Sequence, residues 1–444
     1  MTPRVGVVVV DYDGGELTLG CLRSLARTEW PEGHLDVVLV DNASPAPVTD
    51  RVRAELPAVR IVESSRNLGF AGGVDLGLDA LRDVDHVALV NNDATVPPGW
   101  LTPLVRALED DPRLGAVCPK ILFADRFVEL ELHSRTTRRS RGDRRDVGVR
   151  VSGVEVDGVD VTGRSQFVAG FWGPEHGDDA EPAFQWTSEK ATLRVPVVAG
   201  SDRARIRLAA DISTRLTIAS DGRRAEHDVG DSPAWYDAPL GGEPFDVVHN
   251  VGNEMVADGY GADRGYLARD RGQLDEPEDV FAWCGAAVLL AGAYLDDVGY
   301  LDRRLFMYYE DFEHAWRGRV RGWRYRTEPS SVVRHMHSAT SVEGSSLFGY
   351  YNERNHLLVL VRHAGIGLIV RAFARYVLIT ASYARRDVIS RWLRRERTCT
   401  VEVRRRMRAL LGALRLTPAM VSSRLGDRRR GPRRLSSTRD ISGG

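Results

Sequence analysis

Residues 87–97 of the chain read V-A-L-V-N-N-D-A-T-V-P, and this stretch decides the fold that we expect. The apolar run is typical of a buried strand in a parallel sheet, and it ends abruptly in Asn91, Asn92 and Asp93. Open α/β sheets bind ligands at the carboxyl ends of their strands, where these oxygen atoms suit a divalent cation holding a phosphate. A strand that simply ends in a turn would use the same residue types, so the neighbouring segments have to decide.

The segments around this strand alternate between strand-like and helix-like patterns. Apolar strand-like runs occupy residues 5–10, 37–40 and 59–62, and helix-like segments separate them. This order predicts an α/β fold with a mostly parallel sheet and helices on both faces. Two of these runs end in acidic residues, Asp11 and Asp41, so we expect three acidic strand ends to meet in one crevice.

Length and composition bound the class of protein. The chain has 444 residues, 43% of them hydrophobic and 28% charged, which suits a globular protein of two or three domains. We expect one α/β domain in two halves, residues 1–124 and 245–345, with a β-rich module inserted between them at residues 125–244. A C-terminal helical basic region at residues 346–425 and a disordered basic tail at residues 426–444 are expected to follow.

The inserted module is predicted from a change of pattern after residue 125. Residues 154–161 are typical of a hairpin, because two short Val-containing runs flank a glycine. Apolar and polar residues then alternate with a period of two along residues 204–208 and 216–218. The module is therefore expected to be built from strands.

Charge is distributed unevenly along the chain. From Ser346 onward there are 22 arginines and 6 acidic residues, although the whole chain has a net charge of −1. A basic arm points to an anionic surface, and neither a helix-turn-helix nor an aromatic-interleaved motif supports a nucleic acid. Apolar residues that share helical turns with Arg371 and Arg375 resemble an interfacial amphipathic helix, and a helix packed on the body is the alternative. We expect peripheral binding to the inner face of the plasma membrane.

The expected compartment is the cytoplasm. The four cysteines are far apart and form no C-x-x-C pair, so neither a zinc site nor a disulfide framework is indicated. No secretory signal is expected, because the apolar run of residues 5–10 is too short. No membrane-spanning helix is expected either, because Arg362, Arg371 and Arg375 interrupt the apolar residues 356–383.

A second stretch with chemical potential lies in the second half of the α/β domain. Residues 306–317 read F-M-Y-Y-E-D-F-E-H-A-W-R, and their aromatic run precedes the adjacent acids Glu310 and Asp311. A carboxylate held beside bulky aromatic rings at a cleft is well placed to act as a base. Acids that open a helix also interact favourably with its N-terminus, which is the simpler alternative.

Two further features mark the ends of predicted strands. His335 and His337 follow the predicted strand at residues 331–333, and such a pair offers metal ligation or a phosphate contact. Gly285 interrupts the apolar residues 281–290, which predicts a close backbone approach at that position.

Together these stretches resemble a family 2 glycosyltransferase of the GT-A fold, of the kind that includes bacterial rhamnosyl- and galactofuranosyltransferases. The resemblance covers residues 4–124 and 246–345, and its motifs are V-V-V-D-Y-D, V-L-V-D-N-A-S, R-N-L-G-F-A-G-G, N-N-D, W-C-G-A-A, F-M-Y-Y-E-D-F-E and R-H-M-H-S-A-T-S. It implies an inverting hexosyltransferase that uses a nucleotide diphosphate donor, dTDP-rhamnose or a UDP-sugar. The implied acceptor is a lipid-linked glycan or a cell-surface polysaccharide.

The resemblance also implies roles for individual residues. Asp311 would be the general base, and Asp93 would hold Mg²⁺ or Mn²⁺ that bridges the pyrophosphate of the donor. His335 resembles the family's histidine near the metal, and His337 competes for that role. The remaining implied substrate-binding residues are Asp11, Asp41, Asn42, Ser44, Arg66, Asn67, Gly69, Gly72, Asn92, Gly285 and Glu310.

The chain also departs from the family's pattern. Asn91 replaces the first acid of the usual D-x-D motif, so the metal is expected to be held more weakly. A catalytically inactive sugar-binding scaffold on the same fold is the main alternative, and the presence of both Asp93 and Asp311 argues against it. A nicotinamide-binding fold is disfavoured because residues 11–15 do not supply G-x-G-x-x-G. The sequence leaves the donor sugar, the linkage and the oligomeric state open, a homo-oligomer included.

Overall fold

The computed structural model describes residues 2–140, 143–175, 183–198, 200–336, 345–395 and 398–430. It divides the chain into two compact units. The first comprises Met1–Ala124, Val248–Tyr266 and Arg271–Gly444, and the second comprises Asp125–Val247 and Leu267–Asp270. The second unit corresponds to the inserted module that the sequence predicts, with its C-terminal boundary a few residues later and a short return segment added.

The first unit is built around a mixed sheet in which ten strands are described. The order is β21-β23-β6-β22-β4-β1-β2-β3, with β18 beside β6 and β5 beside β23. Strands β4, β1, β2 and β3 run parallel, whereas β22 runs antiparallel to β4 and β6. The bounds are β1 (Val5–Asp11), β2 (Leu35–Asp41), β3 (Arg60–Glu63), β4 (His86–Val90), β5 (Ala94–Thr95), β6 (Leu114–Phe123), β18 (Val248–Asn250), β21 (Asp279–Val280), β22 (Ala287–Ala291) and β23 (Arg324–His335).

Helices of the α/β unit alternate with these strands, as the sequence predicts, and α3, α4 and α5 pack directly against the sheet. The strands read as continuous apolar runs because their side chains are buried. A small hairpin of β19 (Asn253–Met255) and β20 (Gly261–Asp263) follows β18. The helix bounds are α1 (Glu16–Leu25), α2 (Thr49–Glu55), α3 (Gly69–Ala80), α4 (Leu101–Asp110), α5 (Gly292–Val298) and α6 (Glu310–Val320).

The second unit is a β-structure with its own apolar core. Its nine-stranded sheet follows the order β16-β15-β7-β13-β10-β14-β17, with β11 beside β10 and β12 beside β13. All its neighbouring strands pair antiparallel, which fits the alternating pattern in the sequence. The bounds are β7 (Arg126–Ser134), β10 (Arg150–Val156), β11 (Val159–Asp160), β12 (Gln166–Phe171), β13 (Gln185–Val197), β14 (Ala204–Ala209), β15 (Thr214–Ser220), β16 (Arg223–Val229) and β17 (Ala234–Ala238), besides the separate hairpin of β8 (Thr137–Ser140) and β9 (Asp143–Val147).

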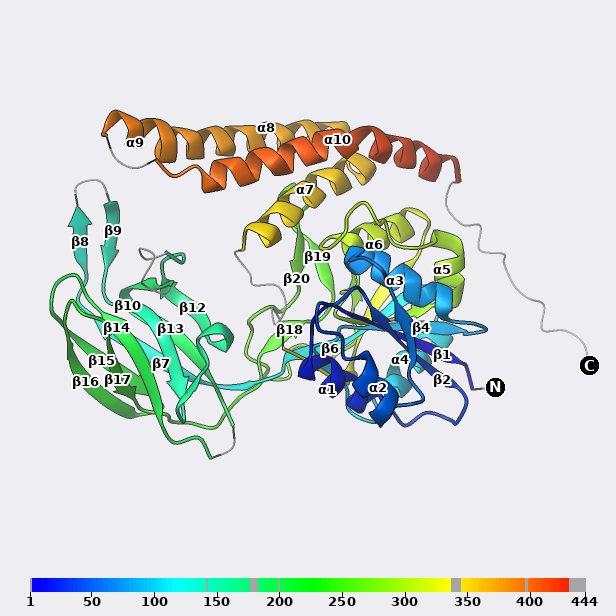
Figure 1. Ribbon diagram of the computed structural model, residues 1–444, viewed down its shortest axis with the longest axis horizontal. Coiled ribbons are helices and arrows are strands. Elements are labelled where there is room, and N and C mark those ends of the chain that lie inside the picture. The colour runs from blue at the N-terminus through cyan, green and yellow to red at the C-terminus, as the bar shows by residue number, and fades with distance from the viewer. Residues whose placement is uncertain are drawn as a thin grey trace, which may run out of the picture. The chain divides into compact units, whose positions relative to one another are not determined.

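The C-terminal helices belong to the first unit (Figure 1). Helix α7 (Ser346–His363) contributes buried leucines to the core of that unit, and α10 (Val401–Arg430) packs along it. Between them lie α8 (Ile366–Tyr383), a π-helical turn (Ala384–Ile389) and α9 (Ser390–Leu393). The sequence predicted disorder from residue 426, but α10 continues to Arg430 because the helical pattern runs on, and the rest of the predicted tail lies outside the described residues.

Two expectations for this region need correction. Ile366–Leu393 is long and apolar enough to cross a membrane by length and composition, with mean hydropathy 1.3 and 17% of its apolar window buried. No such helix was expected from the sequence, but the stretch from Ile366 to Tyr383 contains only two charged residues, Arg371 and Arg375. Arg362, the third arginine expected to interrupt the apolar residues, lies in α7, where it is buried and paired with Glu313.

Candidate active site

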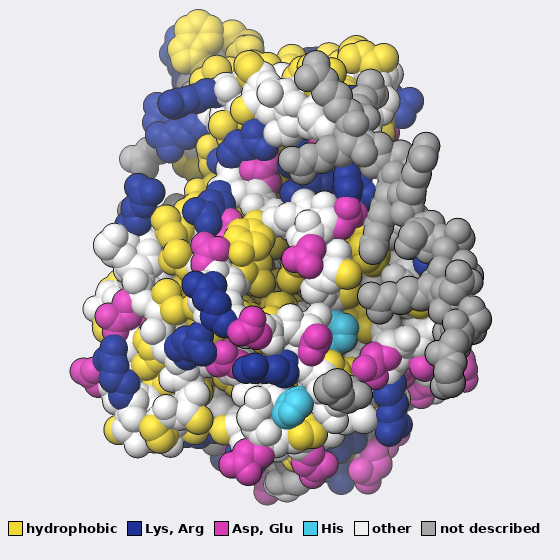
Figure 2. Space-filling view, turned by 90° about the vertical axis from the view of Figure 1, so that its right-hand side faces the viewer, with side chains coloured by type: hydrophobic (Ala, Val, Ile, Leu, Met, Phe, Trp, Pro, Cys, Tyr) yellow, Lys and Arg dark blue, Asp and Glu magenta, His cyan; other side chains and the backbone are white. Residues whose placement is uncertain are grey.

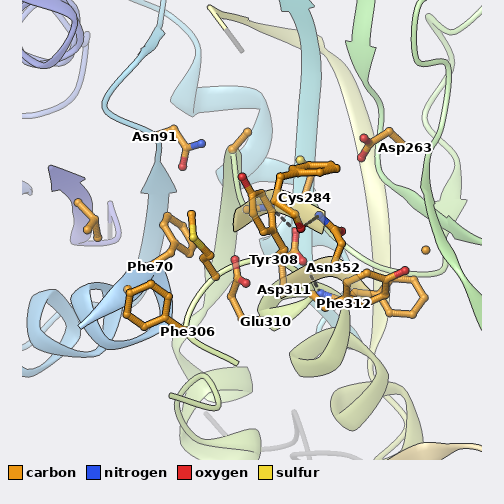
Figure 3. A pocket seen from close by; sticks show the side chains of 18 of the residues that line it. Phe70, Asn91, Asp263, Cys284, Phe306, Tyr308, Glu310, Asp311, Phe312 and Asn352 are labelled. Atoms are coloured by element: carbon orange, nitrogen blue, oxygen red, sulfur yellow. Dashed lines mark hydrogen bonds between the residues drawn. The ribbon is translucent and has the colours of Figure 1, made fainter. Parts of the chain in front are cut away.

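A cavity of about 480 Å³ lies where β1 and β4 end, next to the segment that opens α6 (Figure 3). It belongs entirely to the first unit. The predicted site residues that line it are Asn42, Asn67, Gly69, Asn92, Asp93, Gly285, Glu310, Asp311 and His335. The predicted site residues that do not line it are Asp11, Asp41, Ser44, Arg66 and Gly72. His337 lies outside the described residues.

Asp11 ties the end of β1 to its neighbours. Its buried carboxylate accepts three hydrogen bonds at Oδ1, from Gly14 N at 3.0 Å, Thr18 Oγ1 at 2.7 Å and Asn92 Nδ2 at 2.8 Å. Asn92 is therefore held by Asp11, and the segment after β4 is fixed against α1. The sequence predicted that three acidic strand ends meet in one crevice, but only Asp93 lines the cavity, because the carboxylates of Asp11 and Asp41 are bonded to neighbouring groups.

Asn42 connects the end of β2 to the start of α3. Its Oδ1 accepts a hydrogen bond from Leu68 N at 2.9 Å, and its Nδ2 donates to Gly69 O at 3.0 Å and to Asn67 Oδ1 at 3.2 Å. A single buried amide thus fixes the glycine-containing segment that opens α3. This segment faces the cavity through Asn67 and Gly69.

The remaining predicted residues of this region shape turns and packing. Asp41 Oδ1 accepts from Ser44 N at 3.0 Å, and Ser44 Oγ accepts from Asp13 N at 2.9 Å, so the turn after β2 is fixed by side chains. Arg66 is exposed. Gly72 lies inside α3, where an added Cβ would come within 2.6 Å of the Leu68 Cβ.

Asp93 and His335 form a close pair at the cavity wall. His335 Nε2 lies 2.8 Å from Asp93 Oδ1, and both side chains are buried. Asn91 Nδ2 lies 3.3 Å from the same histidine nitrogen. Among the described residues, no cluster of three or more His, Cys, Asp or Glu side chains could hold a metal ion. A carboxylate oxygen and an imidazole nitrogen are both ligands of divalent ions, and the other ligands would have to come from a diphosphate and water.

Asp311 is held by backbone N–H groups at the first turn of α6. Its Oδ2 accepts from Gly285 N at 2.9 Å, and its Oδ1 accepts from Phe312 N at 2.7 Å. The sequence predicts a close backbone approach at Gly285, and its N–H does bind Asp311, but an added Cβ would make only an ordinary van der Waals contact with Oδ2, at 3.5 Å. Burial raises the pKa of Asp311 to about 6, so the carboxyl is ionised at neutral pH and still basic enough to accept a proton.

Glu310 lies beside Asp311, and its side chain is buried. Burial, together with the charge of Asp311, raises the pKa of the Glu310 carboxyl well above its usual range. Its Oε2 atom has no hydrogen-bond partner within the described part of the chain. Figure 3 shows both carboxyls among the aromatic rings that line the cavity. A neutral carboxylic acid in this place can donate a hydrogen bond to a bound hydroxyl.

The loop before α6 has a strained backbone. Phe306, Tyr308 and Tyr309 have φ values of 68°, 63° and 69°, a region that costs non-glycine residues about 1–3 kcal/mol each. The same loop touches α3, because Phe306 O accepts a hydrogen bond from Ala71 N at 3.1 Å. The loop before α6 is therefore hydrogen-bonded to α3, and residues of both segments line the cavity.

Helix α7 holds this loop through two buried polar side chains. Asn355 Nδ2 donates to the carbonyl oxygens of Leu305, Met307 and Tyr308 at 2.9, 2.8 and 2.7 Å. Arg354 Nε in turn donates to Asn355 Oδ1 at 2.9 Å. Carbonyl groups that the loop turns inward are thereby paired, which stabilises its unusual conformation.

Gly69 offers a direct test of the contact between α3 and the strained loop. Its φ is +71°, and an added Cβ would lie 2.3 Å from Phe306 O. We expect Gly69→Ala to lower the free energy of unfolding by about 2–4 kcal/mol, measured as the urea midpoint. Gly15→Ala is the control, because Gly15 has φ +56° and open space around its Cβ, so only the backbone cost of about 1–3 kcal/mol is expected there, without a clash. Equal losses for the two variants would contradict the contact.

The cavity also contains residues that the sequence analysis did not select. They are His249, Asn253, Asp263, Tyr309 and Asn352. Asn253 and Asp263 are tied together by Asn250, whose Nδ2 donates to Asn253 Oδ1 at 2.7 Å and to Asp263 Oδ1 at 2.6 Å. Only Tyr309 lay in a stretch already noted for its aromatic run. The others come from short strands and a helix with no distinctive spacing.

Three comparisons with known proteins bear on this site. Residues 6–158 match the family model described as "Glycosyl transferase family 2". No curated protein sequence matches the chain. Among solved structures, GalNAc-T7 with UDP, GalNAc and Mn²⁺ is similar with a TM-score of 0.43 at 14% identity, over 81% of this chain and 48% of that one. This chain thus spans about half the length of GalNAc-T7.

Two other solved structures are similar over most of their length. The mannosyltransferase PcManGT from Pyrobaculum calidifontis, in complex with GDP-Man and Mn²⁺, has a TM-score of 0.41 at 13% identity, over 97% of this chain and 86% of that one. TarS from S. aureus has a TM-score of 0.40 at 11% identity, over 96% of this chain and 88% of that one. The match to this family model covers about a third of the chain, and it includes the strands β1 to β6 that lead into the cavity.

Proposed function

We propose that the chain transfers a hexosyl group from a nucleotide diphosphate donor to an acceptor hydroxyl, with inversion at the anomeric carbon. The observation that carries the proposal is a single cavity that contains both the Asp93–His335 pair and the carboxylate of Asp311. Single displacement needs a base for the acceptor and charge stabilisation for the departing diphosphate, and no covalent nucleophile. In this proposal Asp311 is the base, and the Asp93–His335 pair serves the departing diphosphate.

Asp311 is the general base in this proposal. Its two N–H contacts, from Gly285 and Phe312, hold the carboxylate in one orientation, and its raised pKa favours proton acceptance from a sugar hydroxyl. Glu310, whose pKa is raised by burial and by the charge of Asp311, lines the same cavity and would hydrogen-bond the bound sugars. Asp93 and His335 would hold Mg²⁺ or Mn²⁺, which neutralises charge on the departing diphosphate.

The donor and acceptor are proposed from the resemblance of the motifs. We propose dTDP-rhamnose or a UDP-sugar as donor, and a lipid-linked glycan or cell-surface polysaccharide as acceptor. Asn42, Asn67 and Gly69 form the wall against which the nucleotide would lie. The proposed location is the cytoplasmic side, at the inner face of the plasma membrane, where such acceptors are carried.

A thermal-shift series tests the donor site. We expect one of UDP, dTDP or GDP to stabilise the chain in the presence of Mn²⁺, by roughly 2.7 kcal/mol at 100 times its Kd. Asp93→Asn is expected to remove the Mn²⁺-dependent part of the shift, because the carboxylate next to His335 is lost. Asp50→Asn, on the exposed surface of α2, is the control and is expected to keep it.

The series also separates the alternatives. A shift with NAD alone would overturn the transferase proposal. A nucleotide shift without any release of nucleoside diphosphate from a donor sugar would favour a catalytically inactive sugar-binding scaffold.

A further inference from the structure

The helices after α7 leave large apolar side chains in solvent. On the stretch Ile366–Leu393, Leu378 and Trp392 are each 70% exposed, and Ile366, Val370 and Leu393 are similarly exposed. Ile366, Val370 and Leu378 lie within an arc of about 120° around α8, since each residue turns the helix by about 100°. A water-soluble monomer rarely leaves such a continuous apolar face uncovered.

Helix α10 carries a second stripe of the same kind. Its exposed apolar residues recur at spacings of three, four and seven, which places them on one helix face. They are Met407, Leu411, Leu414, Val421 and Leu425. We call the two stripes together the apolar platform.

Arginines surround the apolar platform. In residues 366–395 and 398–427 every exposed charged side chain is an arginine, since Asp387 is buried and Glu402 and Asp427 are partly covered by arginine partners. The exposed set is Arg371, Arg375, Arg385, Arg386, Arg391, Arg394, Arg395, Arg404, Arg408 and Arg415. Figure 2 shows hydrophobic side chains along the upper edge of the molecule, with Lys and Arg side chains directly below them.

We propose that the apolar platform docks onto an anionic phospholipid bilayer, with α8 and α10 lying in the plane of the interface. Apolar side chains enter the headgroup boundary, and the surrounding arginines meet lipid phosphates. The inference rests on the proposed function only for the idea that the acceptor is lipid-linked. The platform itself is argued from exposure and charge.

The packing of α8 argues against a membrane-spanning orientation. Tyr376 is buried, and its hydroxyl donates to Glu353 Oε2 at 2.6 Å and to Arg406 O at 3.0 Å. Arg406 Nε also donates to Thr380 Oγ1 at 3.1 Å. One face of α8 is therefore bonded to α7 and α10, and only the opposite face is free for lipid. A spanning helix would have to break this network.

A second copy of the chain fits the platform less well than lipid does. A two-fold interface places the same patch on both sides, so the arginines around one platform would meet those around the other. Like charges brought together across an interface disfavour that pairing, whereas lipid phosphates complement them. The helix that supports the platform also reaches the cavity, because Leu347, Phe348 and Asn352 of α7 line it. An acceptor carried by the same bilayer would approach the cavity from this side.

Flotation of the full chain with vesicles tests the proposal. We expect the chain to float with vesicles that contain phosphatidylglycerol, and to float far less with phosphatidylcholine alone or at high salt. Leu378→Glu and Leu411→Glu are each expected to weaken partitioning at least tenfold, because a large apolar contact is replaced by a charge that anionic lipid repels. Ile212→Glu, at an exposed apolar residue of the second unit, is the matched control and is expected to float like the parent.

Flotation and the nucleotide-dependent thermal shift are both measured on these variants, so that membrane docking and donor binding are tested separately. The proposal would be overturned if the parent chain did not float, or if Leu378→Glu floated as well as the parent does. It would also be overturned if the chain formed a dimer without lipid and Leu378→Glu dissociated that dimer. The nucleotide-dependent thermal shift reports separately on the donor site, so either proposal can fail alone. Truncation before α7 is unsuitable, because Leu358 and Leu360 of that helix are buried in the core.

Discussion

Asp311→Asn is expected to slow sugar transfer about a thousandfold at pH 7, because general-base catalysis typically contributes between 10² and 10⁴. The amide keeps the shape of the side chain and can still accept at one oxygen, but it cannot take the acceptor's proton. Release of nucleoside diphosphate from the donor, measured with saturating acceptor, gives the rate. Nucleotide binding is expected to survive, since Asp93 and His335 are unchanged.

The pH dependence of the parent should report the same carboxyl. Because burial raises the pKa of Asp311 to about 6, the rate is expected to fall as the pH drops below that value. Stability follows the opposite trend for this group. The folded chain holds the proton more tightly than the unfolded chain, so the group's contribution to stability is present at low pH and is lost as the pH rises from 3.8 to about 6. Asp311→Asn is therefore expected to be more stable than the parent at pH 7.

Glu310→Gln is the informative comparison for this prediction. Since burial and the charge of Asp311 raise the pKa of Glu310 well above its usual range, a neutral glutamine should cost less than the loss of Asp311. A rate for Asp311→Asn within tenfold of the parent, or an unchanged acid limb of its pH profile, would assign the base to another residue. Asp263, which lines the same cavity, would then be the first to test.

Parts of the site that depend on local pattern could be predicted from the sequence. The strand ends at Asp11 and Asn91–Asp93 follow from apolar runs that stop at polar residues, and the topology brings them to one edge. Asp311 follows from acids behind an aromatic run. What the pattern could not show is which polar group supports another, as Asp11 supports Asn92.

Parts of the site that depend on distant pairing could not be predicted. His249 and Asn253 follow an insertion that separates them from β6, the strand that β18 joins. A three-residue strand has too few residues to show a period. The burial of arginines in α7 could not be predicted either, because their partners are distant in the sequence. The composition after Ser346 suggests a basic arm for an anionic surface, whereas Arg354 and Arg362 are buried and bind acceptors on other elements.

Asn355→Leu is expected to lower the free energy of unfolding by about 3 kcal/mol or more, the largest stability loss we expect from a single polar residue of this unit. The side chain is fully buried, and its amide serves the carbonyls of Leu305, Met307 and Tyr308. Leucine has a similar size but no donor, so the carbonyls of Met307 and Tyr308 lose this partner, at about 1–3 kcal/mol each, whereas Leu305 O keeps its bond from Arg354 Nη2 at 2.8 Å. The left-handed backbone of the loop would also lose its support.

Asn352→Ala separates this effect from a general weakening of α7. Asn352 is the same residue type, one turn earlier, and its Nδ2 donates only within the helix, to Phe348 O at 3.2 Å. Its loss is expected to cost less than about 1 kcal/mol. Urea denaturation gives the two midpoints, and hydrogen exchange of residues 305–310 shows whether the loop opens first in Asn355→Leu. Equal midpoints and equal exchange would show that the loop keeps its conformation without α7, and that the left-handed residues are stabilised from the α3 side alone.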